Sequence, residues 1–137
     1  MTTTKPAWVT SDYGTSYEDL VKSWGHEIVD QEEFGSYQGD LIYILRDGDR
    51  HGLLVIGYGS CSGCDELEAR QPWDDEGDWS GVIALADELR QDVHWEADKG
   101  ALMAWVGAHP ESHWWAYDNS IRQWLNGHGA NLNTEEN

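Results

Sequence analysis

Two apolar runs on either side of an Asp-Gly turn limit the fold of this chain more than any other feature. The runs span Leu41 to Leu45 and Leu53 to Ile56, and Asp47 and Gly48 lie between them. Asp-Gly between β-rich runs is typical of a β-hairpin. Both runs are continuously apolar rather than alternating, which is typical of strands covered by other elements. The sequence therefore predicts an antiparallel hairpin at the centre of a sheet, with helices over at least one face.

Helical periodicity and capping residues predict four or five short helices around this hairpin. Apolar residues recur from Tyr17 at helical spacing, and Ser16 precedes them as a cap, so we expect a first helix over Ser16 to Val29. Further helical segments are predicted over Asp65 to Ala69, Ser80 to Arg90, Asp98 to near His109 and Asn119 to Leu125, and short strands at Val93 to Trp95 and Trp114 to Tyr117. The predicted fold class is α+β.

The length of 137 residues is that of one domain. We expect an irregular N-terminal arm over residues 1–15, a single globular domain over residues 16–130 and a disordered polar tail over residues 131–137.

The charge of the chain excludes several classes of partner. Twenty-six Asp and Glu residues against eight Lys and Arg give a formal net charge of −18, which repels phosphate backbones and anionic lipid headgroups. We therefore expect neither direct nucleic-acid binding nor membrane binding. No run approaches the roughly 18–20 apolar residues of a membrane helix. The first ten residues also lack the apolar core of a signal peptide, so we expect a cytoplasmic location.

Cys61 and Cys64 form a CxxC motif in a glycine-rich loop between a predicted strand and a predicted helix. Two packed thiols, a pair of zinc ligands and a redox dithiol are all compatible with it. Zinc needs about four ligands, and no histidine has a spacing that selects it as a further one. The redox interpretation is weakened by the acids from Asp65 onward, which oppose a thiolate. A single close pair of cysteines also fits a reducing cytosol better than a secreted disulfide scaffold.

Acids and tryptophans gather in one part of the sequence. Twelve acidic and only three basic residues lie between Asp65 and Lys99. Most of the nine tryptophans are expected in the core, but exposed tryptophans among charges are typical interface anchors. The alternative is that the acidity serves solubility alone. The predicted partner is a basic protein surface, and the candidate binding residues are Trp73, Asp74, Asp75, Glu76, Asp78, Trp79, Trp114 and Trp115.

No complete catalytic motif is present. The sequence has no P-loop, dinucleotide fingerprint, HExxH pair or EF-hand loop, and Ser60 lacks the following glycine of a nucleophile elbow. A non-enzymatic binding protein is therefore favoured, and catalysis is left open. The alternative function is a zinc-binding or thiol-redox domain centred on the CxxC motif, with zinc as the possible cofactor.

The segment from Arg46 to Gly52, followed by Gly57-Tyr58-Gly59-Ser60-Cys61-Ser62-Gly63-Cys64-Asp65, resembles a pattern in small uncharacterised proteins of actinobacterial phages. The resemblance lies within residues 39–69 and transfers no catalytic residue. It implies a phage-encoded protein that acts in the host cytoplasm. Together with the acidity, it leads us to expect an inhibitor that resembles a polyanion or DNA and occupies a basic site on a host protein.

Overall fold

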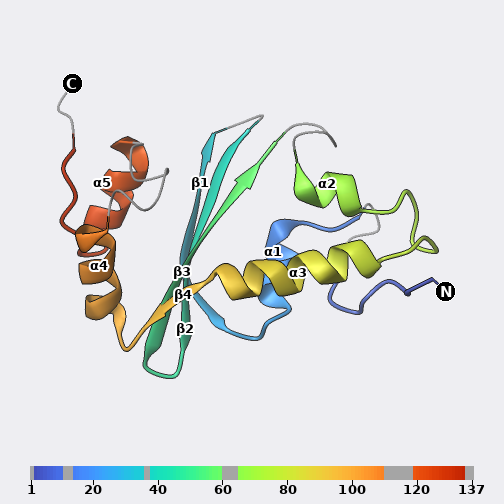
Figure 1. Ribbon diagram of the computed structural model, residues 1–137, viewed down its shortest axis with the longest axis horizontal. Helices are drawn as coiled ribbons and strands as arrows, with labels where there is room; N and C mark the ends of the chain where they lie inside the picture. The colour runs from blue at the N-terminus through green and yellow to red at the C-terminus, as the bar shows by residue number, and fades with distance from the viewer. Residues whose placement is uncertain (1, 11–13, 36–37, 60–64, 110–118, 135–137) are drawn as a thin grey trace.

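The computed structural model describes residues 2–10, 14–35, 38–59, 65–109 and 119–134, and these form a four-stranded antiparallel sheet with five helices. The strands lie in the order β1-β2-β3-β4. Figure 1 shows α1, α2 and α3 on one side of the sheet and α4 and α5 on the other. The strands are β1 (Glu27–Gly35), β2 (Gly39–Asp47), β3 (Arg50–Tyr58) and β4 (His94–Glu96), and the helices are α1 (Tyr17–Lys22), α2 (Glu66–Arg70), α3 (Ser80–Asp92), α4 (Lys99–Ala108) and α5 (Asn119–Gly127). The α+β prediction is confirmed.

The predicted hairpin is formed by β2 and β3, the two central strands. Asp47 pairs with Arg50, so Gly48 and Asp49 form a two-residue turn. Gly48 has a φ of 65°, the sign that a type II′ turn requires at its first central position. This turn fixes the register in which Ile44 lies opposite Leu53.

Helices cover both faces of the hairpin, and this explains why its strands are apolar throughout. Tyr43 and Leu45 pack on one face into a cluster with residues of α1, α2 and α3. Ile42 and Ile44 point to the opposite face, where α4 and α5 complete a second cluster. Successive side chains of a strand point to opposite faces, so two covered faces require apolar residues at every position.

The first helix is shorter than predicted, and a strand follows it. Helix α1 ends at Lys22, Gly25 has a φ of 79°, and β1 begins at Glu27. The prediction of a helix as far as Val29 is therefore wrong in its second half. The apolar spacing was misleading because Ile28 packs against the same cluster as α1, but from the sheet. An irregularity between Ile28 and Asp30 also breaks the alternation typical of a strand.

The other predicted elements in the described residues are present with shifts of a few residues at their ends. Asp98 caps α4, because its side chain accepts a hydrogen bond from the backbone amide of Ala101 at 2.7 Å. The strand predicted at residues 114–117 lies outside the described residues. Among the described helices, none has the length and apolar character needed to cross a membrane.

The ordered structure extends beyond residues 16–130 at both ends. In the N-terminal arm, Val9 is buried and the carbonyl of Thr3 accepts a hydrogen bond from the amide of Trp79 at 3.0 Å. In the predicted tail, Leu132 is buried. Its backbone amide donates a hydrogen bond to the side-chain oxygen of Asn126, and its carbonyl accepts one from the side-chain nitrogen of Asn126, both at 2.8 Å. Residues of both terminal segments thus contribute to the core.

Candidate functional site

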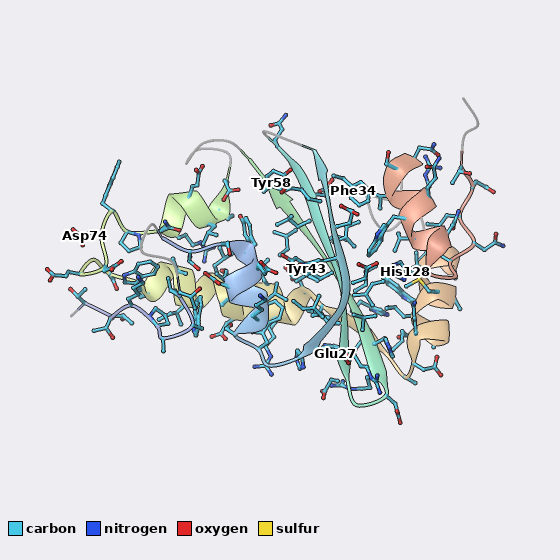
Figure 2. The ribbon with its side chains drawn as sticks, turned by 180° about the vertical axis from the view of Figure 1, so that it is seen from behind. Glu27, Phe34, Tyr43, Tyr58, Asp74 and His128 are labelled. Carbon is cyan, nitrogen blue, oxygen red and sulfur yellow. The ribbon has the colours of Figure 1, made fainter. Side chains whose placement is uncertain are left out.

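The loop between α2 and α3 carries the most exposed large apolar side chain among the described residues. Trp73 has a relative exposure of 105%, so it makes almost no contact with the rest of the chain. The neighbouring Asp74, Asp75 and Glu76 are exposed as well. Asp74 lies at the end of the molecule remote from α5 (Figure 2). We call residues 71–78 the acidic loop.

Trp79, by contrast, is a core residue. Its relative exposure is 1%, and its indole nitrogen donates a hydrogen bond to the carbonyl of Asp75 at 3.1 Å. The Lys5 ammonium lies 5.9 Å from the centre of its ring. The expectation that Trp79 is an exposed anchor is therefore wrong: it holds the base of the acidic loop against the domain.

The acidic residues of the loop differ in their hydrogen bonds and ion pairs. Asp78 accepts hydrogen bonds from the backbone amides of Ser80 and Thr3, both at 3.1 Å, and from the Ser80 hydroxyl at 3.0 Å. These bonds, first of all the one from the Ser80 amide, lower the pKa of Asp78. Asp75 is paired with Lys5 at 3.0 Å. Both residues thus tie the loop to the N-terminal arm.

Asp74 and Glu76 are the acidic residues of the loop whose charge is not neutralised by a nearby cation in the described structure. Asp74 accepts a hydrogen bond from the amide of Glu76 at 3.0 Å, which shapes the turn. Neither carboxylate has a salt bridge within the described part of the chain. The acidic loop therefore presents an indole and two unpaired carboxylates on a backbone that Asp78 and Trp79 hold in place.

A separate cavity of about 570 Å³ lies between the sheet, α1 and α2. This volume is in the range of small-molecule sites. Figure 2 shows Tyr43 and Tyr58 on the side of the sheet that faces α1, and Phe34 and His128 on the other side. The described lining residues are Thr15, Ser16, Tyr17, Glu18, Gln31, Glu32, Glu33, Leu41, Tyr43, Tyr58, Gly59, Asp65, Leu67 and Glu68.

One buried carboxylate holds two walls of this cavity together. Asp65, the last residue of the motif that carries the resemblance, is 7% exposed and caps α2. It accepts hydrogen bonds from the Tyr17 hydroxyl and the Gly59 amide, both at 2.9 Å. It also accepts bonds from the amides of Leu67 at 3.0 Å and Glu68 at 3.1 Å. Asp65 therefore joins the end of β3 to α1 and α2, and unlike the exposed acids of the acidic loop it is buried.

Two tyrosines of the cavity sit in a negative environment. Burial, and then the charges of Glu18 and Glu33, raise the pKa of Tyr43 to about 12. Burial and the charges of Glu33 and Asp40 also raise the pKa of Tyr58. The Tyr58 hydroxyl is buried and has no hydrogen-bond partner in the described structure. Both phenols thus remain neutral hydrogen-bonding groups at neutral pH.

The remaining candidate residues lie outside the described part of the chain: Cys61, Cys64, Trp114 and Trp115. The zinc and redox interpretations therefore stay predictions. Within residues 2–10, 14–35, 38–59, 65–109 and 119–134, no three His, Cys, Asp or Glu side chains form a group that holds a metal. The histidines there include single pairs, such as His128 with Asp30 at 2.8 Å.

The cavity has no motif in the sequence that predicts it. Its acidic wall comes from β1, which was not predicted, and Tyr43 was expected only as a core residue of a strand. The one available signal was a polar stretch, Asp30 to Glu33, close to a strongly apolar strand.

Comparisons of this chain with protein families, with curated proteins and with solved structures found no match.

Proposed function

We propose that this chain is a non-enzymatic binding protein whose acidic loop occupies a basic site on another protein, with Trp73 as the anchor. The complete exposure of this indole beside unpaired carboxylates is the observation that carries the proposal. Following the resemblance to phage proteins, the partner in this proposal is a host protein, and the acidic loop takes the place of a natural polyanion.

The indole supplies the affinity in this proposal. Burial of a tryptophan removes about 150–250 Å² from water, which at about 25 cal/mol per Å² is a gross gain of about 4–6 kcal/mol. Part of that gain offsets the loss of translational freedom on binding. A loop that is already held by Trp79 and Asp78 loses little further conformational entropy, and this favours binding.

The carboxylates supply attraction over distance. Asp74 and Glu76 have no cationic partner within the described structure, so their field reaches a basic surface before contact. Such a field mainly raises the association rate, and salt screens it.

The test is affinity capture from an actinobacterial lysate with quantitative mass spectrometry, using the wild-type chain, Trp73→Ala and Val29→Ala. Val29 is the matched control, because among the described residues it is the other exposed large apolar residue, and it lies on β1. We expect basic proteins that are retained by wild type and Val29→Ala and lost by Trp73→Ala. The thermal melting of Trp73→Ala should stay unchanged, because the indole contacts little of the fold.

Binding kinetics with the purified partner then separate the two contributions. Trp73→Ala should mainly speed dissociation, whereas neutralising Asp74 and Glu76 together should mainly slow association and leave the Lys5–Asp75 pair intact. Equal capture by Trp73→Ala and wild type would refute the anchor. Equal affinity at about 50 mM and about 500 mM salt would refute the electrostatic contribution.

A further inference from the structure

The cavity between the sheet, α1 and α2 has the composition of a site for a small positive group. We propose that it binds an organic cation, an ammonium or guanidinium group on a short alkyl chain. The inference goes beyond the proposed function, because the acidic loop after Gln71 contributes no residue to this cavity. Either site can fail its test without the other.

The floor of the cavity is suited to an alkyl chain. It includes Leu41 and Tyr43 from β2 and Leu67 from α2, and the last two are almost fully buried. Aromatic rings add to this, since a cation close to a tyrosine face is attracted by the ring quadrupole. An apolar body with a charged end therefore fits better than an inorganic ion, which would lose its hydration shell without using the floor.

The rim supplies negative charge. Glu18, Glu33 and Glu68 line the cavity, and no Lys or Arg does so among its described residues. Glu32 also borders it, but it pairs with Ile42, so its side chain points to the opposite face of the sheet. Glu18 is partly used, because Lys22 lies 3.5 Å from it and Gln31 donates to it at 3.2 Å. The carboxylates of Glu33 and Glu68 have no hydrogen-bond or salt-bridge partner in the described structure.

The placement of Glu33 follows from the register of the sheet. Glu33 pairs with Leu41, and Gln31 pairs with Tyr43, so the β1 side chains lie on the same face as this apolar floor. Glu33 itself is exposed, so its carboxylate is accessible to a cation that enters the cavity from this edge.

The Tyr58 hydroxyl is the second observation that indicates a ligand. It is buried without a hydrogen-bond partner in the described structure, and burying an unsatisfied hydroxyl is unfavourable. Glu33, Tyr43 and Tyr58 line the same cavity, and the pairing of Glu33 with Leu41 places Glu33 on the cavity face of the sheet. Both the carboxylate and the phenol oxygen can accept a hydrogen bond from the N–H group of an ammonium or guanidinium.

The experiment is a two-dimensional amide NMR titration of the full chain with n-butylguanidinium and with n-butylurea, its neutral analogue of nearly the same shape. We expect saturable shifts at cavity residues with the cation, and binding of the urea at least about tenfold weaker, as for the loss of a charged hydrogen bond. Glu33→Gln should weaken binding of the cation by a similar factor. Asp87→Asn, the same loss of charge at an exposed position of α3 outside the cavity, should leave it unchanged.

Tyr58→Phe is the second variant. It should weaken cation binding without lowering stability, because the hydroxyl that it removes has no partner in the described structure. A third ligand, the capped tripeptide Gly-Arg-Gly, distinguishes the sources of the cation. Tighter binding of the peptide than of butylguanidinium would identify an arginine side chain of a protein, and weaker binding a free small molecule. The proposal would be overturned if neither butylguanidinium nor the peptide bound saturably, or if butylurea bound as tightly as butylguanidinium. Equal effects of Glu33→Gln and Asp87→Asn on cation binding would also overturn it.

Discussion

Replacing Asp65 by alanine should be among the most destabilising changes of a polar residue in this chain. Its carboxylate accepts four hydrogen bonds, three from backbone amides and one from the Tyr17 hydroxyl. The change would leave the start of α2 uncapped and would detach the end of β3 from α2. It would also break the contact that holds two walls of the cavity together.

The size of the effect can be worked from the burial of the donors. Loss of a helix cap costs about 0.5–2 kcal/mol. The amides of Gly59 and Glu68 lie near the surface, where water replaces part of the lost bonding, and the Leu67 amide keeps the Tyr17 oxygen as a partner at 3.2 Å. The buried Tyr17 hydroxyl is then the main unsatisfied group, at about 1–3 kcal/mol. Together these contributions give about 2–4 kcal/mol, a large share of the 5–15 kcal/mol typical of a domain.

Urea unfolding followed by tryptophan fluorescence measures this difference. Asp98→Ala is the matched control, because Asp98 caps α4 from an exposed position with one hydrogen bond, and its loss should cost about 1 kcal/mol. If Asp65→Ala lowers the free energy of unfolding no more than Asp98→Ala does, Asp65 does not join the three elements as argued.

Three further changes test other parts of the structure. Ile44→Ala should lower the free energy of unfolding by about 2–5 kcal/mol in the same assay, because Ile44 is fully buried in the central strand. Stability should fall as the pH rises from about 10 to about 12, since the pKa of Tyr43 is raised to about 12 in the folded state, and this loss should be smaller in Tyr43→Phe. If the CxxC motif binds zinc, metal analysis of untagged protein should find about one zinc per chain, and Cys61→Ser or Cys64→Ser should release it and lower the melting temperature; metal-free protein with unchanged melting in both variants would refute a ligand role.

Local signals were sufficient for most of the secondary structure. The hairpin was predictable because Gly48 and the apolar runs specify both the turn and the burial of the strands. The start of α4 was predictable because Asp98 is a capping residue directly before an apolar helical pattern. These signals lie within a few residues of the element that they specify, so a single sequence contains them.

The features that were missed depend on residues far apart in the sequence. Trp79 is buried because the N-terminal arm reaches it, with a hydrogen bond between its amide and the Thr3 carbonyl. Asp65 is one of the twelve acids between Asp65 and Lys99, and nothing in that pattern indicates that its partner Tyr17 makes it a buried cap. Neither contact can be predicted from the residues that adjoin Trp79 or Asp65 in the sequence. The edge strand β1 was missed for a related reason: its polar residues have meaning only once the cavity that they border is known.

The proposed binding function accounts for the combination of acidity and an exposed indole, which solubility alone does not require. A surface that serves only solubility needs dispersed charges and gains nothing from an exposed indole, which favours unwanted association. Trp73 is nevertheless fully exposed, while the described core contains the similarly placed Trp79. Of the two tryptophans at this loop, Trp79 is therefore buried in the core and Trp73 is left in solvent. Unpaired carboxylates beside Trp73 and around the cavity also repel one another, which opposes the compact state. In the two proposals made above, a basic partner on the loop and a cation in the cavity would compensate for these features.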